Sequence, residues 1–202
     1  MKKLGTIFLV VLLAMFISSC GTKQAVQREN PDFRNVKWGD SSEIVKQYEI
    51  ETKLSETSVG LTGEVKIENL DALLIYNFDS NDELHTALYD ISGIESSSVT
   101  QCISIYNSLK ETLVEKYGEP EQDQIVKTVD QSLIDTVGES KALECGYILY
   151  GANWETQKTN IRIMLGAPDS EMTLIIAYTD PNYDVSVKTV GDLSGKNASA
   201  KL

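Results

Sequence analysis

The stretch from Val99 to Tyr117 is the most constraining feature of this sequence, because it predicts a long amphipathic helix. Its apolar residues recur at steps of three and four over about five turns. Gly118 follows directly, and glycine favours the left-handed conformation that ends many helices. Pro120 lies just beyond it and cannot continue the helix. A helix with one apolar face needs a second layer to bury that face, so the rest of the chain must supply one.

Strand-like segments on both sides of this helix predict that second layer. Residues 72–78 begin apolar on both faces, as expected of a central strand. Residues 79–82 have the composition of a turn, so the strands flanking them should form a hairpin. Gly60 and Gly63 interrupt the first segment, which predicts an irregular or bulged strand there. The predicted strand segments are 59–67, 72–78, 84–89, a run that opens at Trp154, 161–165 and 172–178.

A shorter helix is expected over 41–49, because Asp40-Ser41-Ser42-Glu43 has the form of a capping box. The order helix, strand, strand, strand therefore occurs twice, over 33–90 and 99–180. We expect an α+β domain over 33–180, in which two tandem helix-β-β-β units form one antiparallel sheet with both helices on one face. The insertion at 119–145 is poorly patterned, apart from a strand-like pair at Ile125 and Val126, and 142–150 fits either a short helix or a strand.

The first nineteen residues have the layout of an export signal. Two lysines precede an apolar run over 7–17, which is shorter than the roughly 20 residues of a membrane-spanning helix. Ile17-Ser18-Ser19-Cys20 resembles the lipobox of bacterial lipoproteins. The resemblance implies cleavage before Cys20, lipidation of its thiol with a diacylglyceryl group, and a flexible tether over 20–32. Two acyl chains give stable anchoring where one gives marginal binding.

This leader implies that the mature protein is located at the outer face of a cytoplasmic membrane. Gly21, the residue after the lipidated cysteine, carries no obvious retention signal, so a Gram-positive host is preferred. A membrane facing the periplasm is the alternative. The core pattern is lost after Pro181, so 181–202 is predicted to be a mostly disordered tail.

The charge of the chain bears on its partners. The formal net charge is −12, and residues 1–19 hold two lysines and no acidic residue, so cleavage makes the chain more acidic still. Nucleic acids and anionic lipid headgroups require clustered lysine and arginine, which this sequence lacks. The expected partners are the membrane, through the N-terminal lipid, and an envelope protein, peptide or glycan.

Two cysteines remain in the folded part, Cys102 and Cys145. An exported compartment permits a disulfide between them, and their number is even. The alternative is two thiols that pack as small apolar residues.

The sequence offers few candidates for catalytic or metal-binding residues. His85 is the one histidine, so it cannot build a multi-histidine metal site, and we expect it on the surface of a strand. The oxygens over 79–83 begin like a calcium loop, but Leu84 and Asp90 occupy the positions that need glycine and glutamate. No pair of carboxylates stands out among the 30 acidic residues. We therefore assign no catalytic residue, no metal site and no cofactor.

Two motifs carry a second resemblance. Trp38-Gly39 with its capped helix, and Leu113-Val114-Glu115-Lys116-Tyr117-Gly118-Glu119-Pro120, resemble a group of uncharacterised bacterial lipoproteins. Asp40 departs from that group, in which methionine is common. These proteins are in turn similar to the β-lactamase inhibitor protein and the small outer-membrane assembly lipoprotein. The resemblance implies helix-plus-sheet units and a binding or scaffolding module, and it offers no catalytic residue.

The leading hypothesis is a membrane-anchored, non-enzymatic module that binds an envelope component through its sheet or loops. It predicts an apolar or aromatic surface patch. One alternative is an envelope hydrolase with paired carboxylates, which predicts two acids facing each other across a cleft. Another is a lipoprotein that captures a small ligand, although the chain is short for the usual two-lobed design.

Overall fold

The computed structural model describes residues 28–183. The signal peptide over 1–19, the lipidated Cys20, the tether up to residue 27 and the tail from 184 to 202 lie outside the described residues. Among the described residues, Arg28 already contacts the body ahead of the predicted start at Phe33, because it forms an ion pair with Asp40. In the part of the chain that is described, no helix is long and apolar enough to cross a membrane.

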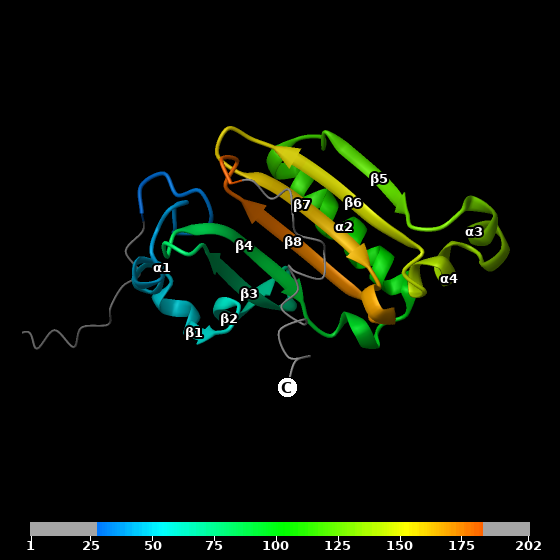
Figure 1. Cartoon of the computed structure of the whole chain (residues 1–202), viewed down its shortest axis with the longest axis horizontal. Coiled ribbons are helices and arrows are strands. Elements are labelled where there is room, and N and C mark those ends of the chain that lie inside the picture. Colours follow the sequence, from blue (N-terminus) through cyan, green and yellow to red (C-terminus); the bar gives the residue numbers. More distant parts are fainter. Residues whose placement is uncertain (1–27, 184–202) are drawn as a thin grey trace, which may run out of the picture.

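One antiparallel sheet of eight strands organises the described residues (Figure 1). Its strand order is β1-β2-β3-β4-β8-β7-β6-β5, and the α+β class predicted from the sequence is correct. The strands are β1 Ser55–Thr57, β2 Gly60–Ile67, β3 Leu70–Phe78, β4 Leu84–Ile91, β5 Gln122–Lys127, β6 Ile148–Glu155, β7 Asn160–Gly166 and β8 Thr173–Thr179.

Each half of the chain contributes a helix followed by four strands that pair in sequence order. Helix α1 (Ser42–Tyr48) precedes β1–β4, and helix α2 (Val99–Tyr117) precedes β5–β8. The halves join through their last strands, because β4 pairs antiparallel with β8. The prediction of three strands per unit was one too low in each half. Strands β1 and β5 consist entirely of exposed residues, so neither carries the apolar alternation that marks a half-buried strand.

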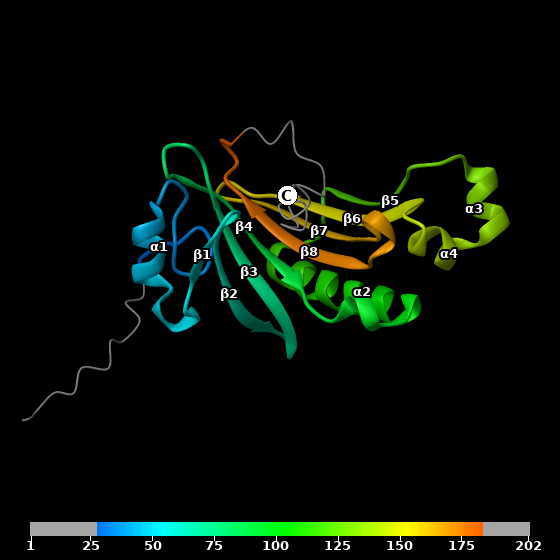
Figure 2. The same cartoon turned by 60° about the horizontal axis from the view of Figure 1, so that its bottom comes forward.

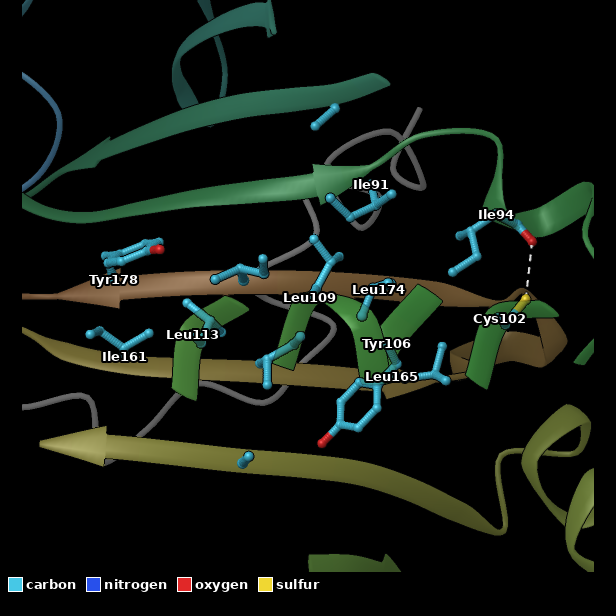
Figure 3. Packing of buried hydrophobic residues seen from close by; sticks show 14 of the residues in the cluster. Ile91, Ile94, Cys102, Tyr106, Leu109, Leu113, Ile161, Leu165, Leu174 and Tyr178 are labelled. Carbon is cyan, nitrogen blue, oxygen red and sulfur yellow. Dashed lines mark hydrogen bonds between the residues drawn. The ribbon is translucent and has the colours of Figure 1, made fainter. Parts of the chain in front are cut away.

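Helix α2 lies across one face of the sheet, as Figure 2 shows. The Ser98 hydroxyl caps its first turn by accepting from the Gln101 N–H, and Gly118 ends it with φ +84°. Its apolar face packs onto β7 and β8 (Figure 3). The residues of α2 that are buried in this cluster are Val99, Cys102, Tyr106, Leu109 and Leu113. Val45 of α1 belongs to the same cluster.

The poorly patterned insertion folds into β5 and two short helices, α3 (Gln131–Val137) and α4 (Glu139–Glu144). Helix α4 buries Ala142 and Leu143, which belong to the main core. The ambiguous segment 142–150 is thus the end of α4 followed by the start of β6. Three short 3₁₀ turns complete the described fold: η1 Ile50–Thr52, η2 Ile94–Ser96 and η3 Pro168–Ser170.

The predicted bulge at Gly60 and Gly63 is in the wrong place. Strand β2 pairs with β3 in continuous register from Leu61 to Ile67, and the register shift lies between β3 and β4, at Asn77 and Phe78. The two glycines serve close packing instead. A Cβ on Gly60 would lie 2.0 Å from the Tyr76 carbonyl oxygen, and one on Gly63 would lie 2.8 Å from Thr52 Cγ2.

Candidate functional site

The sheet face opposite α2, called here the helix-free face, carries a second apolar cluster. No helix of the described part covers β4, β8 and β7 on this side (Figure 2). Three residues of the cluster lie side by side on neighbouring strands, because Ile75 pairs with Leu88 and Leu88 pairs with Ala177. Ile175 completes the cluster, and Val59 and Leu73 pack against it.

An apolar pocket of about 300 Å³ lies beside this cluster, at the end of the sheet near α4. Met164 and Ile175, which pair across β7 and β8, belong to its wall. Leu149 of β6 and the turn at Ala167 and Pro168 close other sides. The lining is dominated by aliphatic carbon, so the pocket suits an apolar group.

Cys145 lines this pocket, and both predicted disulfide partners are free thiols. The Cys102 thiol is completely buried under the start of α2 and donates to the Ile94 carbonyl at 3.5 Å (Figure 3). Burial raises the pKa of the Cys102 thiol, which keeps it protonated and unreactive. Of the two alternatives left by the sequence, the structure has the unbridged pair.

A second concavity, called here the tyrosine pocket, encloses about 420 Å³ on the α2 side of the sheet. Tyr89 of β4, Tyr117 of α2 and Tyr178 of β8 line it. The Phe33 ring lies 4.8 Å from that of Tyr178 and 5.4 Å from that of Tyr89. Burial, together with neighbouring tyrosines, raises the pKa of Tyr178, so its hydroxyl stays neutral.

Three cationic side chains also line the tyrosine pocket: Arg34, Lys116 and Lys158. Lys116 lies over the Tyr117 ring, with its ammonium 4.9 Å from the ring centre. Asp32 is the one acidic residue among those lining the pocket. The opening of the tyrosine pocket is therefore locally cationic, although the chain as a whole has a net charge of −12.

The wall of the tyrosine pocket is fixed by an ion pair whose carboxylate is buried. Arg34 donates from Nε to both carboxylate oxygens of Glu49, at 3.1 and 3.0 Å, and from Nη2 to Thr52. The Glu49 side chain is 2% exposed. Burial alone would lower the pKa of Arg34, but the hydrogen bond and charge of Glu49 outweigh it, so the guanidinium stays charged.

The N-terminal segment is also fastened to the turn between β6 and β7. Trp38 donates its indole N–H to the Lys158 carbonyl at 2.8 Å, and the Thr159 hydroxyl donates to the Asp32 carbonyl at 3.2 Å. These bonds join residues far apart in sequence. They therefore hold both sides of the tyrosine pocket in place.

His85 is buried, in contrast to the prediction of a surface histidine. The residue is 8% exposed, and its ring stacks on Tyr183 at a centroid distance of 3.8 Å. The turn that starts at Asp180 brings Tyr183 back over β4, since the Asp180 N–H donates to the His85 carbonyl. This turn follows the last strand, in a part of the sequence without an apolar pattern, so the burial of His85 under Tyr183 could not be predicted.

The turn at 79–82 is the hairpin predicted from its composition. Asp79 accepts from the backbone N–H groups of Glu83 and Asn81, and these bonds lower its carboxyl pKa. The described residues contain no cluster of acids, cysteines and histidine that could hold a metal ion. The acidic residues buried in the described part, Asp40 and Glu49, each form an ion pair with an arginine.

The sequence drew attention to neither pocket. Leu149 lay in a segment that fitted either a short helix or a strand, and Met164 and Ile175 appeared as ordinary strand residues. The tyrosines of the second pocket lay in the predicted helix and strands, where nothing marked them as a site. The sequence predicted one apolar sheet face under the helices, and only 72–78 was apolar on both faces at its start, so a pocket on the face opposite α2 was not expected. No family model, curated protein or solved structure matches this chain. The resemblances noted from the sequence therefore stay predictions.

Proposed function

We propose that this chain is a non-enzymatic binding module of a bacterial cell envelope, anchored through a lipid on Cys20. Its ligand is an apolar segment of an envelope protein, which places a side chain in the apolar pocket. The observation that carries the proposal is this pocket of about 300 Å³ on the helix-free face. The apolar cluster beside it is itself buried, each residue being at most 4% exposed, so the pocket alone offers the contact.

The energetics of recognition support this assignment. A few anchor side chains that enter desolvated pockets supply most of the binding energy of an interface. Leu149 and Ile175 offer aliphatic walls of the kind such an anchor needs. The negative charge of the chain favours a neutral or basic partner and steers its approach.

We also infer that the two halves are copies of one ancestral unit, a helix followed by a sheet meander. The support is the shared order of elements and the meeting of the two last strands, β4 and β8, at the centre of the sheet. A unit with one helix leaves an open sheet edge beside its last strand. Joining two units at that edge buries it.

The binding proposal is tested by a charge placed in the pocket. Leu149 is half-buried, so Leu149→Lys should allow folding while opposing an apolar anchor. Leu133→Lys is the matched control, because Leu133 is 39% exposed on α3. With the lipidated chain as bait in its own envelope, we expect Leu149→Lys to recover about tenfold less of a chemically cross-linked partner than wild type or control. Equal recovery by all three folded chains would contradict the proposal.

The anchor is tested separately. Cys20→Ala removes the thiol that a diacylglyceryl group requires, so the protein should move from the membrane fraction to the soluble fraction. A Cys145→Ala chain, which keeps Cys20, is the control and should stay with the membrane. Full membrane retention of Cys20→Ala would show that another element holds the chain there.

Capture of a small anionic ligand is the second candidate, because the tyrosine pocket gathers Arg34, Lys116 and Lys158 in an acidic chain. Arg34 is committed to Glu49, so the two lysines would supply the free charge. Nuclear magnetic resonance titration with inorganic phosphate and with acetate tests it. Shifts at Tyr89 and Tyr178 that disappear in Lys116→Gln/Lys158→Gln would favour this function over the first.

A further inference from the structure

Strand β5 forms one edge of the sheet and is unusually exposed. In the described part it pairs with β6 alone, and all six of its residues are exposed. Ile125 and Val126 are 41% and 38% exposed, and they are two of the three large apolar residues exposed in the described chain. Protein edges are commonly protected by proline, a bulge, a covering helix or charged side chains, and of these β5 has, among the described residues, only the charges of Asp123 and Lys127. The register of β5 with β6 has no bulge, and the strand contains no proline.

The backbone groups that β5 presents to solvent follow from its register. The Thr128 N–H donates to the Tyr147 carbonyl at 2.8 Å, one step beyond the pair of Lys127 and Ile148. Hydrogen-bonded and non-bonded pairs alternate along an antiparallel ladder. The even-numbered residues of β5 therefore bond to β6, and the N–H and C=O groups of Asp123, Ile125 and Lys127 point outward.

These outward groups lie on a self-complementary strand. A second copy of β5, running antiparallel and centred on Ile125, would place Asp123 opposite Lys127 of the second copy. Asp123 also pairs with Lys110 of its own chain at 2.8 Å, and its side chain stays 47% exposed, so the second lysine would add to that pair. The two-fold axis repeats the pair of Asp123 and Lys127, and it sets Ile125 opposite its own counterpart. Opposite charges and apolar residues that face each other across strands both stabilise pairing. The three side chains also share the α2 face, because Ile125 pairs with Tyr150, which packs against the main core.

We propose that two copies of this chain associate by antiparallel pairing of their β5 strands, so that the two sheets become continuous across a two-fold axis. Such an interface is isologous, and it satisfies the outward backbone groups of both edges. It is independent of the apolar pocket and of the lipid anchor. Two six-residue strands bury less than the ~1,600 Å² of a standard interface, so the dimer should be weak, with a dissociation constant of about micromolar or higher.

Charge reversal tests the pairing. The association is measured by sedimentation of the full chain in detergent. Concentrations from about 10 to 500 µM cover the dissociation constants expected of a weak interface of this size. Lys127→Glu faces Asp123 with a like charge at two symmetric positions and should weaken association by about tenfold. Asp123→Lys/Lys127→Glu restores opposite charges across the axis but places a like charge beside Lys110, so association should recover above the Lys127→Glu level without reaching that of wild type. Lys141→Glu, an equal change of charge on α4, should have no effect.

The register is tested by cross-linking. In the proposed pairing Gln124 lies opposite Val126 of the second copy, in a non-bonded pair where side chains are closest. In a Cys145→Ser background, a Gln124→Cys chain mixed with a Val126→Cys chain of different tagged length should form a mixed disulfide dimer on oxidation. A mixture of Gln122→Cys with Val126→Cys, which lies out of register, should form far less.

Three results would overturn the proposal. The wild-type chain could sediment as a monomer over the whole concentration range. Lys127→Glu and Lys141→Glu could weaken association equally, which would indicate general repulsion between acidic molecules. The two cysteine mixtures could cross-link to the same extent, which would indicate random collision.

Discussion

The polar residues around the start of the fold show how single side chains set its geometry. Ser41, within the capping box predicted from the sequence, is the cap of α1, since its hydroxyl accepts from the Ile44 N–H. Asp40 has another role, because it accepts from the Lys37 N–H and forms an ion pair with Arg28. Short-range pattern located the cap, whereas the arginine partner could be seen only in the folded chain.

The Arg34–Glu49 pair should be the most sensitive polar contact in the protein. Arg34→Ala leaves the Glu49 carboxylate buried without its cation, and we expect a loss of about 2–3 kcal/mol in the free energy of unfolding. The measurement is urea denaturation. Lys66→Ala is the control, because both partners of the Lys66–Asp71 pair are more than two-thirds exposed, and its effect should be below about 1 kcal/mol.

The Tyr106 hydroxyl, unlike the Arg34–Glu49 pair, should contribute nothing to stability. It is buried, and no described residue forms a hydrogen bond with it that would offset the cost of burial. Tyr106→Phe should therefore leave stability unchanged or raise it by up to about 1 kcal/mol. Trp154→Phe should destabilise, because the indole N–H donates to the Gly118 carbonyl at 2.7 Å. A lower urea midpoint for Tyr106→Phe would show that the hydroxyl has a partner.

At the scale of elements, α2 is defined at both ends by local chemistry and along its length by burial. Its cap, its apolar stripe and its final glycine were all readable from spacing. Strand β5 is the counterexample. It has no buried residue, so its conformation is imposed by pairing with β6 rather than by any pattern of its own.

The N-cap of α2 can be tested directly. Ser98→Ala removes the acceptor for the Gln101 N–H and should lower the free energy of unfolding by about 1 kcal/mol. Ser104→Ala, at an exposed position inside the same helix, is the matched control and should stabilise slightly, because alanine is the better helix former. Thermal or urea unfolding followed by circular dichroism gives both values. Equal effects would show that the cap contributes nothing.

At the scale of the whole molecule, the core is rich in buried tyrosine. Burial raises the pKa of Tyr76, Tyr89 and Tyr178, so the folded state holds their phenolic protons more tightly than the unfolded chain does. The unfolded chain releases them near the ordinary tyrosine pKa of about 10. Their contribution to stability is therefore complete below that pH and is lost as the pH rises above it.

We expect the urea midpoint to be constant between about pH 8 and 9 and to fall steeply above about pH 10. Tyr76→Phe, which removes one of these protons, should make the alkaline fall shallower. The absorbance of ionised tyrosine should rise together with unfolding for the buried rings. A midpoint that stays flat through pH 11 would contradict the burial of these hydroxyls.

Reducing agent should leave the fold unchanged, because Cys102 and Cys145 are free thiols. The unfolding midpoint with and without dithiothreitol is the test. Cys145, which is half-buried, should alkylate in the native protein, whereas the fully buried Cys102 should react only after unfolding. A midpoint that falls on reduction would reveal a bridge.

The sequence by itself determined the α+β class, helix α2, the capped start of α1 and most strands, because each depends on periodicity or capping within a few residues. Only the tertiary structure decided that β5 forms an edge, that His85 lies under Tyr183, and that Arg34 reaches Glu49. It also decided that the apolar pocket lies on the face opposite α2. These features join residues distant in sequence, and no local pattern encodes which strand edges and sheet faces meet.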